Sequence, residues 1–451
     1  MALGSPNLGT LGAKAFFSIP YLPAIVAEWF ALIPLVCHLA AYAEDHELIG
    51  KISLTCNLSV GLFPKLGSLD AIARLLRGKV EFLDQASTKG NMYNVWDVIC
   101  GGSFPCANCS ASRIIAAYAT RNGPLTKIPE SVKQTDHPNE TIKVRECGHD
   151  RLKADLQRKS STGYFRRPQT LHVMRFRREV NQQSIRKKIF DLMALPSFQA
   201  VLRLMELGLV VTLILFGAYG TAAVLLSSLL CRFACWFATI GRPSGYLENN
   251  ETHNASMLVG LHKNTTIWYL YVGDRGVVDW LLNKTMISIK SPHAALSKFL
   301  WVAHHFQLLA MTYVAAQKGW DGVCLLALLF VDGIIRSALG QNELAQMWLD
   351  MNGVSVDAQS FEFSGRTSMV GAIQIISAAP KASWMDDIIT PSARREVWNN
   401  RLNAFQKRVT AEESEKDLSS SDHAWVELNT RLSIQAASII QSMRKRNNSC
   451  E

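Results

Sequence analysis

Residues 207–231 read LGLVVTLILFGAYGTAAVLLSSLLC, a run without a charged side chain. The run is long enough to cross a bilayer, because a hydrocarbon core of about 30 Å needs roughly 20 apolar residues of helix. Lipid offers no hydrogen bonds to the backbone, so only a helix or a closed barrel satisfies the peptide groups there. The sequence therefore predicts one long transmembrane helix over residues 204–240.

Three further apolar segments are predicted to cross the membrane. Residues 24–43 carry only Glu28 and His38 as ionisable groups, and residues 298–316 and 322–339 are joined by a short loop that predicts a helical hairpin. The alternative is that the shorter runs are core helices of a large soluble domain, because such lengths are ambiguous. We expect a membrane α-helical fold with about four transmembrane helices.

The remaining chain is predicted to lie outside the membrane. Its expected parts are an N-terminal segment (1–23), a long basic loop (44–203), two extramembrane pieces (241–297 and 340–408), a flexible linker (409–423) and an amphipathic helix (424–446). Residues 242–297 and 340–407 are expected to form one small α+β domain. Within it, the apolar runs 255–262 and 266–272 predict a β-hairpin, and Asp274 is expected to cap a following helix.

Charge predicts an orientation and a partner. The net charge is +10, and residues 159–188 are dense in arginine and lysine. Since Lys and Arg near membrane spans mark the cytoplasmic side, we place residues 44–203 in the cytoplasm and residues 242–297 on the lumenal or extracellular side. The lipid bilayer is the expected partner, with anionic lipid attracted to residues 159–188. We do not expect nucleic acid binding, and protein partners are not predicted.

Glycosylation acceptors divide between the two loops. Asn250, Asn254, Asn264 and Asn283 each begin an Asn-x-Ser/Thr motif in the loop placed in the lumen, and we expect them to be N-glycosylated. Three more motifs, at Asn57, Asn108 and Asn139, lie in the loop placed in the cytoplasm.

Several segments of the sequence resemble those of a known protein family. They include GNMYNVWDVICGGSFP (90–105), LKADLQRKSSTGYFRRP (152–168), RPSGYLENNETH (242–253), WYLYVGDRGVVDWLLNKTM (268–286) and FSGRTSMVGAIQIIS (363–377). The chain from about residue 90 to 398 resembles an uncharacterised family of polytopic integral membrane proteins from filamentous fungi. That resemblance implies a fungal membrane protein and carries over no activity or catalytic residue.

Two groups of residues are candidate sites. Cys106 and Cys109, with Cys147 and His149, offer three thiolates and an imidazole that would suit zinc, against the alternative of ordinary thiols or disulfides. No other cofactor is expected.

The second group would lie inside the membrane. An antiparallel hairpin about Gly319 would bring His304 and His305 near Asp332 and Arg336, and such a polar cluster can relay protons. The alternative is that Asp332 and Arg336 simply pair along their helix.

These observations predict a multi-pass membrane protein of the secretory pathway or plasma membrane. Its activity is expected to be non-enzymatic, that of an accessory or scaffold component, and accessory to a fungal pathway if the resemblance holds. The alternative is a small transporter or membrane-embedded enzyme that uses the His/Asp cluster. No motif in the sequence names a reaction or a catalytic residue.

Overall fold

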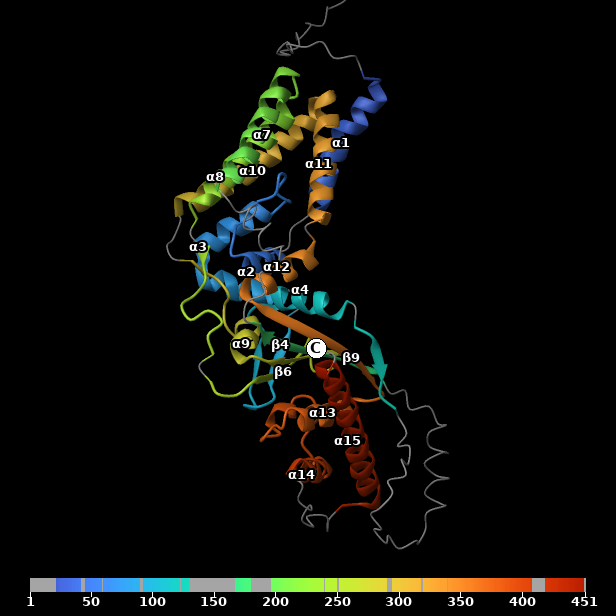
Figure 1. Cartoon of the computed structure of the whole chain (residues 1–451). Coiled ribbons are helices and arrows are strands. Elements are labelled where there is room, and N and C mark those ends of the chain that lie inside the picture. Colours follow the sequence, from blue (N-terminus) through green and yellow to red (C-terminus); the bar gives the residue numbers. More distant parts are fainter. Residues whose placement is uncertain are drawn as a thin grey trace, which may run out of the picture.

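The computed structural model describes residues 22–41, 45–58, 60–89, 92–121, 123–129, 167–179, 196–238, 240–249, 251–289, 294–317, 319–338, 340–407 and 418–449 (Figure 1). The molecule is elongated, with a group of long helices at one end and a β-sheet covered by helices at the other.

The sheet has seven strands in the order β2-β1-β6-β7-β4-β9-β3. They are β1 (Asn94–Asp97), β2 (Ser103–Pro105), β3 (Leu125–Lys127), β4 (Gln169–Arg178), β6 (Ala255–Gly260), β7 (Ile267–Gly273) and β9 (Val354–Phe363). The sheet is mixed, because β4 pairs with β7 and β3 pairs with β9 in parallel, whereas the other pairs are antiparallel. A separate small sheet pairs β5 (Ile240–Gly241) with β8 (Ser288–Ile289).

The interior strand β4 carries apolar side chains on both faces, so both faces of the sheet need a cover. Leu171 and Val173 join the core beneath α13 (Arg366–Ile376), α14 (Ala393–Lys407) and α15 (Ser420–Ser449). Met174 and Phe176 join the opposite core, which includes side chains of α4 (Cys109–Thr120), α9 (Arg275–Leu282) and α12 (Gln341–Asn352). The result is a three-layer α/β arrangement, which we call the body.

The other end of the molecule, here the helical end, consists of α1 (Ala24–Ala40), α7 (Pro196–Leu215), α8 (Tyr219–Trp236), α10 (Ala294–Gln317) and α11 (Trp320–Ala338) with their connecting turns (Figure 1). Between it and the body lie α2 (Asp45–Thr55) and α3 (Ser68–Lys89). Ile52, Leu76, Cys231 and Leu300 share one buried cluster, which joins α2 and α3 to α8 and α10.

The predicted fold class is wrong. The sheet includes β1 to β4 from the long basic loop, so the α+β domain is far larger than residues 242–297 and 340–407. Among the described residues only α8 and α10 are both long and apolar enough to cross a membrane, against about four expected spans. Apolar composition alone did not reveal how much of the loop belongs to a sheet.

The predicted long helix over 204–240 is a helical hairpin. The backbone leaves α7 after Leu215, passes through Gly217 with a φ of 79°, and starts α8 at Tyr219. Glycine adopts this left-handed conformation without steric cost. Because the chain reverses there, both open ends of the hairpin lie toward the body (Figure 1).

The predicted orientation fails for the same reason. β4, from the loop placed in the cytoplasm, pairs with β7, from the loop placed in the lumen, along seven residue pairs from Thr170↔Ile267 to Phe176↔Gly273. Two strands of one sheet cannot lie on opposite sides of a membrane.

Local predictions within residues 242–363 are confirmed. β6 and β7 form the expected antiparallel hairpin. The Asp274 carboxylate accepts a hydrogen bond from the Val277 amide at 3.0 Å and so caps α9.

Candidate functional site

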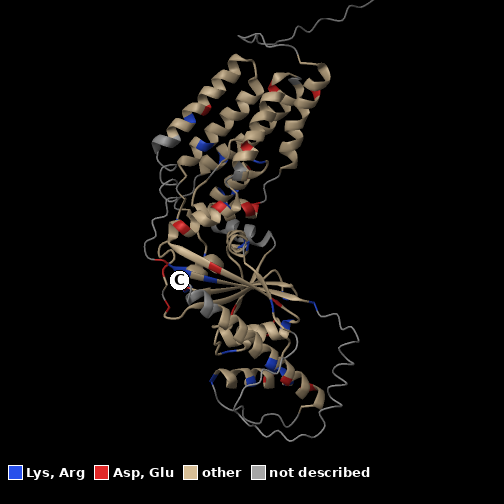
Figure 2. Ribbon diagram, turned by 45° about the vertical axis from the view of Figure 1, so that its right-hand side comes forward, with Lys and Arg blue, Asp and Glu red and all other residues tan. Residues whose placement is uncertain are grey.

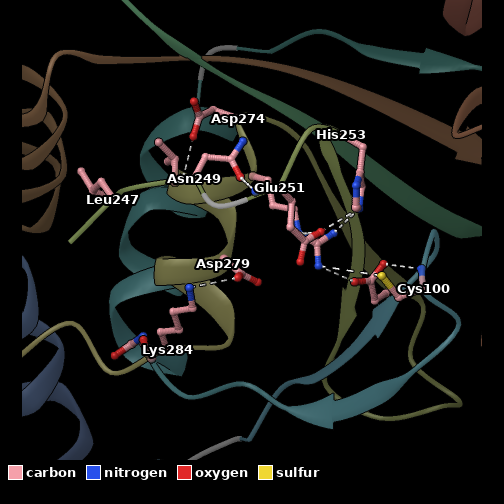
Figure 3. Close-up of polar contacts among 12 residues, drawn as sticks. Cys100, Leu247, Asn249, Glu251, His253, Asp274, Asp279 and Lys284 are labelled. Carbon is pink, nitrogen blue, oxygen red and sulfur yellow. Dashed lines mark hydrogen bonds and ion pairs between the residues drawn. The ribbon is translucent and has the colours of Figure 1, made fainter. Parts of the chain in front are cut away.

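A partly buried ionic cluster lies where α9 meets the sheet and surrounds Arg275 (Figure 3). The Arg275 Nη2 lies 3.3 Å from Asp97 Oδ2, and its Nη1 lies 3.0 Å from His253 Nε2. Its Nε is 3.0 Å from Glu251 Oε2, at an angle too poor for a hydrogen bond, so this contact is an ion pair only. Asp97 also accepts hydrogen bonds from the backbone amides of residues 99 and 100.

The electrostatics of this cluster favour structure over catalysis. Burial alone would lower the pKa of the Arg275 guanidinium, but the charges of Asp97 and Glu251 outweigh it and raise that pKa. The nearby Cys100 thiol has its pKa raised by burial and by Asp97, so it is not an activated nucleophile. The cluster therefore ties the end of β1 and the loop before β6 to the start of α9.

We expect Arg275→Met to destabilise the body by about 3 kcal/mol, because it leaves the buried Asp97 carboxylate without its cation. The matched control is Lys284→Met, since Lys284 pairs with Asp279 at 3.5 Å but is about two-fifths exposed. Its expected cost is below about 1 kcal/mol. Chemical unfolding followed by tryptophan fluorescence measures both, and equal costs would refute this role for Arg275.

The turn from Gly273 to Gly276 resembles a phosphate loop but holds no anion site. The N-terminus of α9 is filled by the Asp274 carboxylate, which also pairs with Arg178 at 3.0 Å. A carboxylate in that place occupies the position that a phosphate would need.

The predicted zinc ligands are only partly described. Cys147 and His149 lie outside the described residues. Cys106 is buried, with its sulfur 3.7 Å from Ser112 Oγ, and burial raises its pKa to about 12. Burial also raises the pKa of Cys109. Within the described part of the chain no three His, Cys, Asp or Glu side chains gather as metal ligands would, so the zinc site stays a prediction.

Cys106 also makes stability depend on pH. Its folded pKa of about 12 lies above the ordinary value of 9.0, so the buried neutral thiol contributes stability that is complete below pH 9 and is lost as the pH rises toward 12. We expect Cys106 to resist alkylation at pH 8.5 in the folded protein and to react after unfolding. Mass spectrometry of iodoacetamide-treated protein tests this, with the exposed Cys100 as internal reference. Labelling of Cys106 as fast as Cys100 would contradict it.

The predicted intramembrane cluster is placed only in part. His305 is exposed, and its Nδ1 lies 2.8 Å from the Trp301 carbonyl oxygen one turn earlier. The ring of His304 lies 5.3 Å from that of His305. Asp332 is buried on α11, and the side chain of Arg336 lies outside the described ones. The described contacts of the two histidines are with Trp301 and with each other, so their convergence with Asp332 stays a prediction.

The glycosylation candidates differ in accessibility. Asn254, Asn264 and Asn283 are exposed, whereas Asn250 is not described. Asn108, from the other loop, is buried, and its Nδ2 donates to the carbonyl oxygens of Trp280 at 2.9 Å and Lys284 at 2.6 Å. Its Oδ1 accepts from the Met286 amide at 3.4 Å. Asn108 thus holds the end of α9 and the segment after it against α4, a role that sequence spacing could not indicate.

Removing the Asn108 amide should be costly. We expect Asn108→Ala to lower the free energy of unfolding by about 2–3 kcal/mol, because three backbone groups lose a buried partner. The exposed Asn283→Ala is the control, with an expected change within about 0.5 kcal/mol. Denaturant titration of both variants tests this, and an Asn108→Ala variant as stable as the control would exclude the proposed contacts.

The basic stretch 159–188 is not a free lipid-binding loop throughout. Its residues 169–178 form β4, and Arg175 is buried within the sheet. Arg178 is occupied by Asp274 and by the Leu247 carbonyl oxygen. Residues 159–166 and 180–188 lie outside the described part of the chain.

The most unusual surface belongs to the helical end. Many of its large apolar side chains are exposed, for example Leu204, Met205, Leu309 and Phe330, which are 66–70% exposed. Among the described residues, only six exposed large hydrophobic side chains lie elsewhere: Leu125, Leu261, Ile267, Met351, Phe405 and Leu428. Figure 2 shows few charged residues on the helical end. Large exposed apolar surfaces of this kind mark sites that bind a membrane or another protein.

Known proteins give no further guide. No family profile matches this chain, and no curated protein or solved structure matches it. The resemblance to fungal membrane proteins therefore stays a prediction.

Proposed function

We propose that the protein is a membrane-bound component whose helical end is inserted in a lipid bilayer and whose body lies outside it. The observation that carries the proposal is the concentration of exposed large apolar side chains on the helical end. Because removing apolar surface from water is favourable by about 25 cal/mol per Å², contact with lipid would stabilise this end of the molecule.

The incomplete burial of α8 and α10, the two helices long and apolar enough to cross a membrane, argues against their being core helices of a water-soluble domain. Only 33% of the most apolar window of α10, and 50% of that of α8, is buried within the protein. A core helix of the same composition would be mostly buried. The rest of each helix needs an apolar neighbour, and lipid provides one on all sides.

The charged groups of the helical end support the same environment. Arg232 on α8 and Glu206 on α7 form a two-point ion pair, with contacts of 2.7 and 2.5 Å, and both side chains are mostly buried. Ionisable groups in lipid are expected to be paired in this way.

A non-enzymatic role fits the body best. Its buried ionic cluster around Arg275 ties segments together, and its cysteines Cys100, Cys106 and Cys109 have raised pKa values. We propose an accessory or scaffold component that carries an α/β body on a membrane surface.

Fractionation tests the proposal. The full chain, expressed in eukaryotic cells, is expected in the membrane pellet after washing with 1 M salt and after extraction at pH 11, and in solution only after detergent is added. Release by salt would reduce the attachment to surface electrostatics. A monodisperse full chain in the detergent-free supernatant would overturn the proposal.

A further inference from the structure

We infer that the body faces the cytosol, so that the base of the helical end meets the anionic cytoplasmic leaflet. This inference rests on the proposed insertion of the helical end and adds to it the side of the membrane and the kind of lipid surface. Three independent features of the chain carry it.

The first feature is the sheet, because segments that pair in one sheet must all lie on the same side of the membrane. β4 lies between β7 and β9 along its length, with Val173 opposite Leu270 and Gln359. Residues 167–179, 251–273 and 354–363 therefore share one compartment, and the whole body is either cytosolic or lumenal.

The second feature is the distribution of Lys and Arg around the helical end. The α7–α8 turn (216–218), which lies at the end of the molecule far from the body, contains no Lys or Arg, and the sequence between α10 and α11 contains one, Lys318. The sequence next to the opposite ends of the same helices is much richer, with Arg186, Lys187, Lys188, Arg203, Arg242, Lys290 and Lys298. An excess of Lys and Arg beside membrane helices marks the cytoplasmic side.

Two of these cations also have the surroundings of a membrane interface. The Arg203 guanidinium lies 4.9 Å from the ring centre of Trp236, an exposed side chain at the end of α8. Lys298 is exposed at the start of α10, three residues before the exposed Trp301. Tryptophan and cations gather at the headgroup level, where cations are attracted to an anionic leaflet.

The third feature is Asn108, which begins the acceptor motif Asn108-Cys109-Ser110. A glycan would be attached to Nδ2, the atom that donates to the carbonyl oxygens of Trp280 and Lys284. In the lumen this motif would be offered for modification, and a modified Asn108 could not enter its buried place. In the cytosol the motif meets no glycosylating enzyme. The same reasoning leaves Asn254, Asn264 and Asn283 unmodified, although they are exposed.

Glycosylation mapping of the full chain tests the side. In microsomes, the wild-type chain is expected to keep its gel mobility after glycosidase treatment. The control variant is Gly9→Thr, which completes an acceptor motif at Asn7, ahead of α1 in the sequence. The first residues of α1 lie at the far end of the molecule from the body (Figure 1). Gly9→Thr is expected to gain a glycosidase-sensitive shift. Extraction at pH 11 of the same microsomes reports insertion separately.

The outcomes are distinct. A wild-type shift that disappears in the variant Asn250→Gln/Asn254→Gln/Asn264→Gln/Asn283→Gln, with the chain still in the pH 11 pellet, would overturn the orientation and leave the insertion standing. A chain released at pH 11 would overturn the proposed insertion itself. If neither chain shifts, trypsin added to sealed microsomes decides: loss of a tag placed after residue 451 supports a cytosolic body, and protection of that tag refutes it.

Discussion

Replacing Arg232 by leucine is expected to destabilise the helical end by about 3–5 kcal/mol, because the Glu206 carboxylate would stay in apolar surroundings without its cation. The pair joins α7 to α8 through two contacts, Nη1 to Oε1 at 2.7 Å and Nη2 to Oε2 at 2.5 Å. Both side chains are about one-fifth exposed within the protein, and lipid would remove the water that remains. Thermal unfolding in detergent micelles measures the loss.

The double variant Glu206→Leu/Arg232→Leu separates the pair from its surroundings. Removing both charges is expected to restore most of the stability, because apolar replacements of a buried ion pair are often neutral or stabilising. If water reached this ion pair, the single variant would cost below about 1 kcal/mol and the double variant would bring no recovery. That result would contradict the apolar environment assigned to α7 and α8.

Asp321→Ala is expected to be the second most damaging change, at about 3–4 kcal/mol, because it removes the acceptor that caps α8 from another helix. The carboxylate of this buried residue accepts from the amides of Gly220 at 2.8 Å and Thr221 at 2.7 Å, and from the Thr221 hydroxyl. The contact fixes the turn of the α7–α8 hairpin to the start of α11.

Two companion variants test the geometry of this contact. Asp321→Asn retains one acceptor oxygen and should lose less than half as much stability as Asp321→Ala. Gly220→Ala should be as harmful as Asp321→Ala, because its methyl group would lie 2.7 Å from Asp321 Oδ2 and would also collide with Val314. The melting temperatures of the three variants in detergent provide the comparison. A harmless Gly220→Ala would show that the helices do not meet there.

Local structure was predictable from the sequence where neighbouring residues alone determine it, as in strands and helix caps. β-branched and aromatic runs predicted β6 and β7, and Asp274 was recognised as a helix cap. The site around Arg275 was not predicted. Its partners Asp97 and Glu251 are distant in sequence, and only the folded sheet brings them together.

Two errors had physical causes. The turn at 216–218 carries none of the polar residues that usually mark a chain reversal, and the start of α8 that follows it is capped by Asp321, about 100 residues away. The glycines Gly217 and Gly220 were the available signal. β4 was not predicted because its arginines, such as Arg175, make the segment look like part of a basic loop. The signal for a strand was the set of apolar side chains that it presents on both faces, Leu171, Val173, Met174 and Phe176.

Contact between the helical end and lipid tails is the claim on which the account depends, and fluorescence quenching by brominated lipids measures it directly. In a chain whose native cysteines are replaced, single cysteines are introduced at Leu309 and Phe330 and labelled with an environment-sensitive dye, and the labelled protein is reconstituted in vesicles. Cysteines at Phe405 and Leu428, which are exposed on the body, are the controls. We predict strong quenching at the first two positions and none at the controls. Equal, weak quenching at all four would contradict the account.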